Sequence, residues 1–191
     1  MCGRLNVIAD PLCQEVSNIL GICFSTATNK DLRPTQQVSA FYQPQFGFHQ
    51  IETSWGIKPA WSKKLLINAQ AETITEKKTF KHAFTYNRCL VPCSGWYEWK
   101  SESSGKQKYL FEHAQKKPLF MAAIAYFNDP KSYAQVVTLT TQPNERCSPY
   151  HNRMPVFVLA ENINYWFNSQ ANQLTPLLTA LPNNEISIHK C

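Results

Sequence analysis

The feature that most constrains the fold is a series of short extended segments between residues 88 and 139. Five runs in this region are rich in aromatic and β-branched residues and are separated by turn-forming residues, a pattern typical of β-strands. The linker at 103–106 is Ser-Ser-Gly-Lys, so the runs on either side of it are expected to form a hairpin. The expected strands cover residues 88–92, 96–100, 107–112, 119–126 and 133–139.

One helix is predicted near the beginning of the chain, over residues 10–21. Its apolar residues recur at helical spacing, Asp10 is the expected N-cap, and Pro11 and Gly21 suit the first turn and the stop. Twelve prolines, mostly between the expected elements, agree with a strand-rich fold that has many connections. Further helices are expected over 75–86 and 161–169, strands over 38–42, 48–55, 154–159 and 186–189, and loops over 29–35 and 59–64.

Length, composition and charge narrow the class of protein. A chain of 191 residues fits one domain, and 43% hydrophobic with 17% charged residues can form a core and is unlike a disordered chain. The formal net charge of +6 favours an anionic partner. The longest apolar stretch, 119–127, is shorter than the roughly 20 residues of a membrane-spanning helix, and the N-terminus has no apolar signal region. We therefore expect a soluble, cytoplasmic protein with no membrane partner.

The chain has seven cysteines, and one of them is chemically unusual. The number is odd and nothing signals secretion, so reduced thiols are expected. Removal of Met1 would leave Cys2 with an α-amine of pKa about 8 and a thiol of pKa about 8.5 on neighbouring carbons. This pair can condense with an aldehyde and close a thiazolidine ring, or the thiol alone can act as a nucleophile. The alternative is that Cys2 is only the second residue of a frayed terminus.

Three further residues are candidates for acid–base or positioning roles. Glu98 stands among the aromatic residues of 96–99, and desolvation there would raise its pKa towards that of a general acid. His151 lies in a loop between two prolines, and the ordinary pKa of histidine suits proton transfer near neutral pH. Asn68 is a polar residue that follows an apolar pair. A plain structural role stays open for each: an exposed glutamate, an ordinary histidine and a turn-forming asparagine.

A metal site and a nucleic-acid site compete for some of these residues. Two C-x3-spaced pairs could give Cys₃His ligation of zinc, but residues four apart on a strand lie roughly 13 Å apart. Scattered basic residues together with Trp61 and Trp99 suit a single-stranded nucleic acid, although a solvated basic surface with buried tryptophans explains them equally well. The residues of the zinc hypothesis are Cys89, Cys93, Cys147 and His151.

Seven short motifs follow one another along the chain. They are Met1-Cys2-Gly3-Arg4, Leu32-Arg33-Pro34-Thr35, Trp55-Gly56, Ile67-Asn68-Ala69 with Ala71-Glu72-Thr73, Cys89-Leu90-Val91-Pro92, Gly95-Trp96-Tyr97-Glu98-Trp99 and His151-Asn152-Arg153-Met154-Pro155. In this order they closely resemble the SRAP family, the SOS response-associated peptidase-like proteins. The resemblance extends from residue 1 to about residue 160, and the ordered set is far more specific than any single motif.

The resemblance implies a covalent reaction with damaged DNA. Members of the family bind single-stranded DNA and crosslink to abasic sites. The amine of the terminal cysteine, here Cys2, condenses with the aldehyde of the ring-opened sugar, and the thiol then closes a stable thiazolidine that shields the lesion from strand cleavage. Asn68 would hold the terminal cysteine, Glu98 would shuttle protons, and His151 would assist Schiff-base chemistry at the sugar.

The resemblance also implies a fold, a partner and a set of DNA contacts. The expected fold is a single α+β domain over residues 1–191, built on curved antiparallel β-sheets that form a barrel-like body with a few peripheral helices. The expected partner is single-stranded DNA with abasic sites, bound by a monomer without cofactor or metal and, in a bacterium, at the nucleoid. Arg4 and Arg153 would bind phosphates, while Pro34, Trp61 and Trp99 would wedge between or stack on bases.

The sequence departs from the family at one position of the site, and other functions stay open. Gln70 stands where the family usually has Arg, so one charged phosphate contact is missing, and Lys63 and Lys64 are candidates to replace it. The abasic-site reaction could be accompanied by lyase-type or autopeptidase activity. One alternative function is an N-terminal-nucleophile cysteine peptidase or amidase. Another is a non-enzymatic module that binds zinc or nucleic acid.

Overall fold

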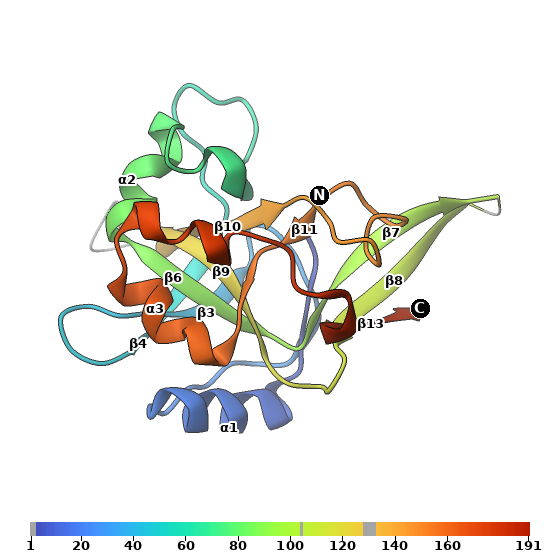
Figure 1. Ribbon diagram of the computed structural model, residues 1–191, viewed down its shortest axis with the longest axis horizontal. Coiled ribbons are helices and arrows are strands. Elements are labelled where there is room, and N and C mark those ends of the chain that lie inside the picture. Colours follow the sequence, from blue (N-terminus) through green and yellow to red (C-terminus); the bar gives the residue numbers. More distant parts are fainter. Residues whose placement is uncertain (1–2, 104, 128–132) are drawn as a thin grey trace.

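Five strands close into a barrel at the centre of the fold (Figure 1). The computed structural model describes residues 3–103, 105–127 and 133–191. In the order β10-β4-β3-β6-β9, each strand pairs with the next, and β9 pairs again with β10. The strands are β3 (Gln37–Tyr42), β4 (His49–Trp55), β6 (Arg88–Cys93), β9 (Leu119–Tyr126) and β10 (Ala134–Thr141).

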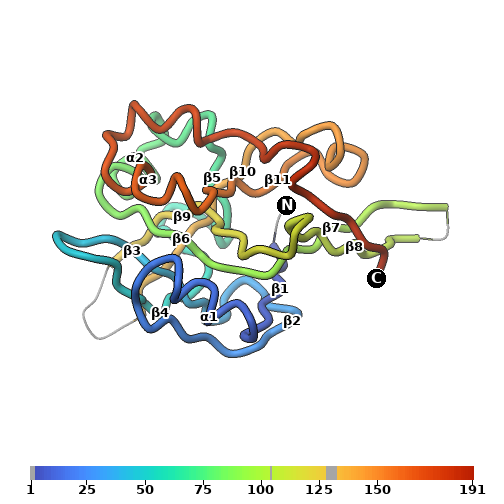
Figure 2. Tube along the Cα trace, turned by 60° about the horizontal axis from the view of Figure 1, so that its bottom comes forward, coloured from blue at the N-terminus to red at the C-terminus, as the bar shows by residue number. Residues whose placement is uncertain are grey.

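A second sheet adjoins the barrel and extends away from it. Its order is β13-β8-β7-β1-β2, and all its pairings are antiparallel. The long hairpin of β7 and β8 projects from the body of the molecule in both views (Figures 1 and 2). Glu102 pairs with Gly105 at its tip, which confirms the predicted hairpin. The strands are β1 (Leu5–Val7), β2 (Asn29–Leu32), β7 (Gly95–Glu102), β8 (Gly105–His113) and β13 (Ile186–Lys190).

The helices lie on the periphery of this β-structure. In α1 (Ala9–Leu20) the apolar stripe of Leu12, Val16 and Leu20 is buried, and Gly21 ends the helix with a φ of 67°. The other helices are α2 (Lys78–Tyr86) and α3 (Ile163–Asn168). Five short 3₁₀ turns complete the described helical elements: η1 (Ala71–Thr73), η2 (Ala160–Asn162), η3 (Ala171–Gln173), η4 (Thr175–Leu177) and η5 (Asn183–Glu185).

The core fills the barrel and is rich in aromatic side chains. Phe41 packs edge-on against Phe48 and Phe120, with ring centroids 5.7 and 5.8 Å apart. Arg88 ties α3 to the barrel, because its guanidinium donates hydrogen bonds to backbone carbonyl oxygens of α2 and of the segment from Trp166 to Ser169. Together these observations confirm an α+β fold with a barrel-like sheet and a few peripheral helices. No helix within the described ranges has the length and apolarity needed to cross a bilayer.

Several predicted elements differ from the structure, and each difference has a physical reason. Residues 29–32 form β2 rather than a loop, because their backbone pairs with β1 and Leu32 is buried opposite Leu5. The expected helix over 75–86 begins only at Lys78, since 74–77 forms a turn whose N–H groups bond to Thr73. At α1 the structure agrees with the prediction, because Asp10 has the extended backbone of an N-cap (φ −107°, ψ 120°) and the regular helix starts after it.

The predicted strand over 154–159 is divided in two. β11 (Met154–Pro155) pairs with β10, whereas β12 (Phe157–Val158) pairs with β9. Val156 between them donates its N–H to Leu139 and accepts from the N–H of Ala122, so the chain crosses from one strand to the other there. The antiparallel prediction also misses two parallel pairings, in which β10 lies beside β4 and beside the short strand β5 (Asn68–Gln70).

Candidate functional site

The segments that carry Asn68, Glu98 and His151 lie where the hairpin meets the barrel. One side is formed by β5, β10 and β11, the other by β7 and β8, and the loop of residues 142–153 runs between them (Figure 1). This loop carries His151 and leads directly into β11. Residues distant in the sequence therefore meet at one place because β5 and β11 both pair with β10.

Asn68 begins β5 and is oriented by a buried threonine. The two residues are paired in the parallel register, and the hydroxyl of Thr138 donates to Oδ1 of Asn68 over 2.6 Å. Thr138 is only 1% exposed, so this contact is held rigidly. Because the amide oxygen accepts from Thr138, the Nδ2 group of Asn68 is the end that can donate to another partner.

A groove of about 330 Å³ runs past Asn68. Its walls combine aromatic, amide and basic side chains, which suits a nucleic acid that exposes both bases and phosphates. Trp61 lies at the groove on the loop over 59–64 and is 70% exposed, as expected for a stacking residue. The lining includes Trp61, Asn68, Gln70, Lys77, Phe80 and Arg153.

Glu98 lies on the buried face of β7 and is only 3% exposed. On the same face Trp96 stacks on Phe111, with ring centroids 4.9 Å apart. The ring of Tyr150, from the 142–153 loop, lies 5.3 Å from that of Phe111 and covers this face. A carboxylate enclosed in this way is shielded from bulk water, an environment that suits proton transfer. The exposed-glutamate interpretation of Glu98 is therefore wrong.

The same loop brings a thiol close to Glu98. Burial raises the pKa of the Cys147 thiol to about 12; the positive charge of Arg146 opposes this shift and the negative charge of Glu98 adds to it. Cys89 and Cys93 are fully buried in β6, and burial raises the pKa of both thiols as well. These three cysteines therefore remain protonated at neutral pH. Across the described residues, no cluster of three or more His, Cys, Asp or Glu side chains is placed to hold a metal ion.

His151 is half-buried and oriented by the backbone of its own loop. Its Nδ1 accepts the backbone N–H of Arg153 over 3.0 Å, and the backbone N–H of His151 donates to the carbonyl of Cys147. The carbonyl oxygen of Arg153 lies 3.1 Å from the same nitrogen. The backbone of Arg153 therefore fixes the direction of the ring through Nδ1.

Arg153 is held in an ion pair. Its two terminal nitrogens bind both carboxylate oxygens of Glu72 over 2.8 and 2.7 Å, and one of them also donates to the carbonyl of Thr140. The hydrogen bond from Arg153, opposed in part by burial, holds the pKa of Glu72 below its usual value. Arg153 lines the groove, as a phosphate contact would, but its charge is partly compensated.

A second basic and aromatic surface lies on the opposite face of β7. The guanidinium of Arg4 lies over the ring of Trp99, 5.3 Å from its centroid, and binds Asp31 over 2.8 Å. Lys108 lies over the rings of Tyr97 and Trp99 and is 3.7 Å from Asp31. This surface contains two of the predicted DNA contacts, Arg4 and Trp99, on the other side of the strand from Glu98.

Two predicted residues are less closely connected to the site. Pro34 is half-buried in the turn after β2, next to Thr35, which has a φ of 73° and donates its N–H to the carbonyl of Trp55. Cys2 lies outside the described residues. Its nearest described neighbours are Gly3 and Arg4, and the carbonyl of Arg4 accepts the N–H of Tyr97 over 2.9 Å.

Sequence reasoning missed the residues that orient the site. They are separated from their partners by tens of residues, as in the pairs Thr138–Asn68 and Glu72–Arg153, and no local pattern indicates such pairs. Asp31 lies in β2, a segment that was expected to be a loop, so its ion pairs were not predicted. For Lys108 the only available signal was the alternation along the predicted hairpin, which places it opposite Trp99.

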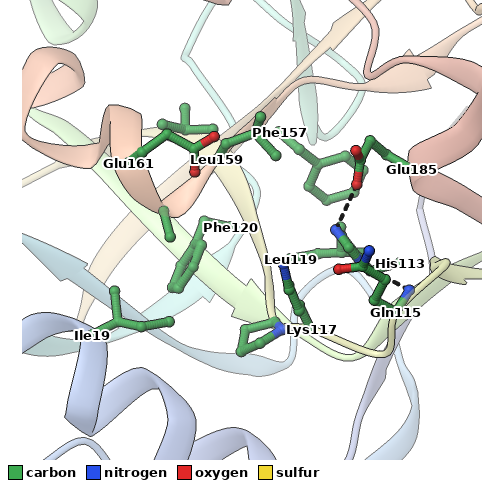
Figure 3. A pocket seen from close by; sticks show the side chains of 13 residues that line it. Ile19, His113, Gln115, Lys117, Leu119, Phe120, Phe157, Leu159, Glu161 and Glu185 are labelled. Carbon is green, nitrogen blue, oxygen red and sulfur yellow. Dashed lines mark hydrogen bonds and ion pairs between the residues drawn. The ribbon is translucent and has the colours of Figure 1, made fainter.

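A separate cavity of about 250 Å³ contains none of the predicted residues (Figure 3). It lies among α1, the connection between β8 and β9, and β12. The nearly buried His113 binds Glu185 over 3.0 Å at its edge, and burial lowers the pKa of this histidine although Glu185 opposes the shift. This contact joins the end of β8 to the segment that leads into β13.

The chain is similar to several known proteins. A curated relative, abasic site processing protein YoaM from Bacillus subtilis, is 30% identical over 147 residues, which cover 72% of this chain and 65% of that protein. Abasic site processing protein YedK from Escherichia coli is 30% identical, with coverage of 64% and 56%. The chain thus spans about 55 to 65% of the length of the first curated relatives that it matches.

Solved structures show the same fold. A phage-related protein from Bordetella bronchiseptica superposes with a TM-score of 0.83 at 23% identity, and the match covers 100% of this chain and 94% of that one. A second protein from the same organism reaches a TM-score of 0.85 at 19% identity, with coverage of 100% and 99%. A family model described as SOS response associated peptidase (SRAP) matches residues 1–191. This chain therefore belongs to the SRAP family.

Proposed function

We propose that this protein recognises abasic sites in single-stranded DNA and shields them by forming a covalent thiazolidine crosslink through Cys2 after Met1 is removed. The observation that carries the proposal is the buried carboxylate of Glu98 on the strand that pairs with the N-terminal strand. The names of the curated relatives, abasic site processing proteins, support the same substrate.

The strand register supports a meeting between the N-terminus and Glu98. In the antiparallel pair of β1 and β7, Leu5 is opposite Trp96 and Asn6 is opposite Gly95. The same register continued by two residues brings Gly3 level with Glu98. The hydrogen bond from Tyr97 to the carbonyl of Arg4 shows that the pairing already extends beyond Leu5.

The proposed reaction needs only the protein and the sugar. The unprotonated α-amine of Cys2 adds to the aldehyde carbon, and one water leaves as the C=N bond of an imine forms. The thiol then adds across that bond: sulfur joins the former aldehyde carbon, its proton goes to nitrogen, and the thiazolidine ring closes. No redox partner is involved, so we propose no cofactor.

The described residues have distinct roles in this scheme. Glu98 would accept and return the protons that addition and loss of water require. Asn68 would hold the terminal cysteine through Nδ2, and His151 would donate from Nε2 to the sugar oxygen. Because a single chain supplies all of these groups, we propose that the protein acts as a monomer.

DNA would lie along the groove and across the hairpin. Trp61 and Phe80 provide aromatic surfaces on the groove side, and Trp99 provides one on the hairpin side. Arg4 and Arg153 would contact the phosphates on the two sides of the lesion, with Lys77 in the groove near the position of Gln70. Stacking on these surfaces requires unpaired bases, which favours single-stranded over double-stranded DNA.

The direct test is a denaturing gel with single-stranded DNA that contains one abasic site. We expect the wild-type protein to give a shifted band that survives heating, and Cys2→Ala to lose it. Cys23→Ala removes an exposed cysteine away from the site and serves as the matched control, which should crosslink like the wild type. Undamaged DNA of the same sequence should give no band.

Other outcomes would favour other functions. A heat-stable band that persists in Cys2→Ala would contradict the thiazolidine mechanism. Cleavage of the DNA strand without a stable band would indicate a lyase, and Cys2-dependent hydrolysis of a peptide without crosslinking would indicate a peptidase. An intact mass that shows retained Met1 would also contradict the proposal, because the amine would then not belong to Cys2.

A further inference from the structure

We infer that Glu72 is a positioning residue that sets the orientation of His151 by holding Arg153. The inference rests on the proposed function, in which His151 acts on the abasic sugar. Glu72 lies in η1, directly after β5 and therefore close to Asn68 in the chain. Its carboxylate contacts Thr141 of β10 as well as Gln142 and Arg153 of the 142–153 loop, so it joins η1 to both.

The contacts of this carboxylate hold Arg153 and the start of the 142–153 loop in place. Both oxygens of Glu72 are bound by the two terminal nitrogens of Arg153, a bidentate geometry that fixes the guanidinium in plane and in direction. Oε1 also accepts the backbone N–H of Gln142, 3.2 Å away, at the start of the loop. One carboxylate thus fastens both ends of the segment 142–153.

The other side of Arg153 is equally constrained. Nη2 donates to the carbonyl of Thr140 over 2.6 Å, and the side chain is only 13% exposed, compared with 41% for Glu72. Immediately after Arg153 the chain enters β11, where Met154 pairs with Thr141. Arg153 therefore has a fixed side chain and a fixed following residue.

The backbone of Arg153 in turn fixes the imidazole of His151. Its N–H donates to Nδ1 of His151 over 3.0 Å, and its carbonyl oxygen lies 3.1 Å from the same nitrogen. A neutral ring accepts at Nδ1 from the N–H, and a protonated ring can donate from Nδ1 to the carbonyl. In either state Nδ1 faces the backbone of Arg153, so the position of Arg153 sets the direction of the whole ring.

A simpler role for Glu72 makes a different prediction. If Glu72 only neutralises Arg153, its removal would strengthen the attraction of the groove for phosphate and tighten DNA binding. If Glu72 positions the loop, its removal would slow the reaction even when all protein sites are filled with DNA. Rate at saturation and DNA concentration at half-saturation therefore distinguish the two roles.

The test measures single-turnover crosslinking to abasic single-stranded DNA for Glu72→Ala, Glu72→Gln and the control Glu76→Ala. Glu76 is exposed and only four residues away, so its removal changes the net charge equally. We expect Glu72→Ala to lower the saturating rate about 10-fold, because small displacements of a reacting group are costly. Glu72→Gln retains an acceptor for Arg153 and should restore part of the rate, and Glu76→Ala should match the wild type.

A second readout does not depend on activity. Nitrogen-15 NMR of the His151 ring should show the Nε2–H tautomer in the wild type and in Glu76→Ala, and a mixture of tautomers in Glu72→Ala. An altered pH–rate profile of Glu72→Ala should accompany this change.

The inference is overturned if Glu72→Ala keeps the wild-type tautomer and saturating rate, or changes only the DNA concentration at half-saturation. If the wild-type protein itself forms no crosslink, the proposed function is wrong, and the NMR result still decides whether Glu72 positions His151.

Discussion

The two faces of strand β7 have opposite environments. On one face Glu98 is enclosed beneath the 142–153 loop, beside the stacked rings of Trp96 and Phe111. On the other face Trp99 lies partly exposed beneath the cations of Arg4 and Lys108. Adjacent residues in the sequence thus have different surroundings, since strand alternation separates the proposed site for proton transfer from the proposed surface for phosphates and bases. If this division is correct, substitutions on the first face should change the rate and those on the second should change the affinity.

The largest effect is expected for Glu98→Gln, which keeps the shape of the side chain and removes its capacity to exchange protons. General acid–base catalysis contributes about 100-fold or more, so the rate of crosslinking at saturating abasic DNA should fall by about that factor. Affinity for undamaged single-stranded DNA, measured by fluorescence anisotropy, should stay within about twofold of the wild type. A large loss of affinity with an unchanged rate would remove the distinction between the two faces.

Trp99→Ala tests the opposite face. Loss of one stacking surface is expected to weaken binding of single-stranded DNA about 10-fold, within the usual range for a base stacked on an aromatic ring. The saturating rate of crosslinking should change little. Tyr86→Ala, which removes an aromatic side chain that is 73% exposed on α2, provides the control and should bind DNA normally.

Thr138→Val tests the hydrogen bond that orients Asn68 at the groove. Valine has the shape of threonine but cannot donate to Oδ1 of Asn68, so the amide would lose its fixed orientation. The crosslinking rate should fall about fivefold, which corresponds to a typical hydrogen bond of about 1 kcal/mol. DNA affinity should be unchanged. A normal rate in this variant would show that Asn68 is oriented by other contacts.

The predictable part of this protein lies where the local pattern and the tertiary structure agree. The strand over 119–126 is observed with the predicted bounds. Of the apolar stripe predicted for α1, Leu12, Val16 and Leu20 are buried, whereas Ile19 is 42% exposed. Residues 29–32 illustrate the opposite case: Asn-Lys-Asp-Leu has little strand preference, yet pairing with β1 makes it a strand. The site divides in the same way. Glu98 and His151 are candidates that the sequence alone suggests. Thr138 gives no such signal, and the sequence places Glu72 in a motif without indicating its partner Arg153, because these contacts form only in the folded chain.

The smallest expected effect is on the free energy of unfolding, and it concerns Asp31, which lies beside Arg4 and Lys108. Hydrogen bonds from Arg33, and then from Arg4, hold the pKa of Asp31 below its ordinary value of 3.8. The ionised carboxylate therefore stabilises the fold above that pH, and this contribution is lost as the pH falls through the lowered value. Because Asp31 is 39% exposed and screened by salt, Asp31→Asn should cost less than about 1 kcal/mol at pH 7.

Urea unfolding at pH 7 and at pH 2.5 checks this sign. The difference in free energy of unfolding between Asp31→Asn and the wild type should shrink at the lower pH. It should also shrink in about 1 M salt, where interactions between surface charges are largely screened. A difference that grows on acidification would show that Asp31 is not stabilised by its cationic neighbours.

The central claim, capture of an abasic site by the N-terminal cysteine, is tested most directly by the mass of the crosslinked peptide. The wild-type protein is incubated with abasic single-stranded DNA, digested with nuclease and trypsin, and analysed by mass spectrometry. The account predicts a sugar adduct on the peptide of residues 2–4, without Met1 and with the loss of one water, as thiazolidine formation requires. An adduct on a lysine, or on a peptide that retains Met1, would contradict it.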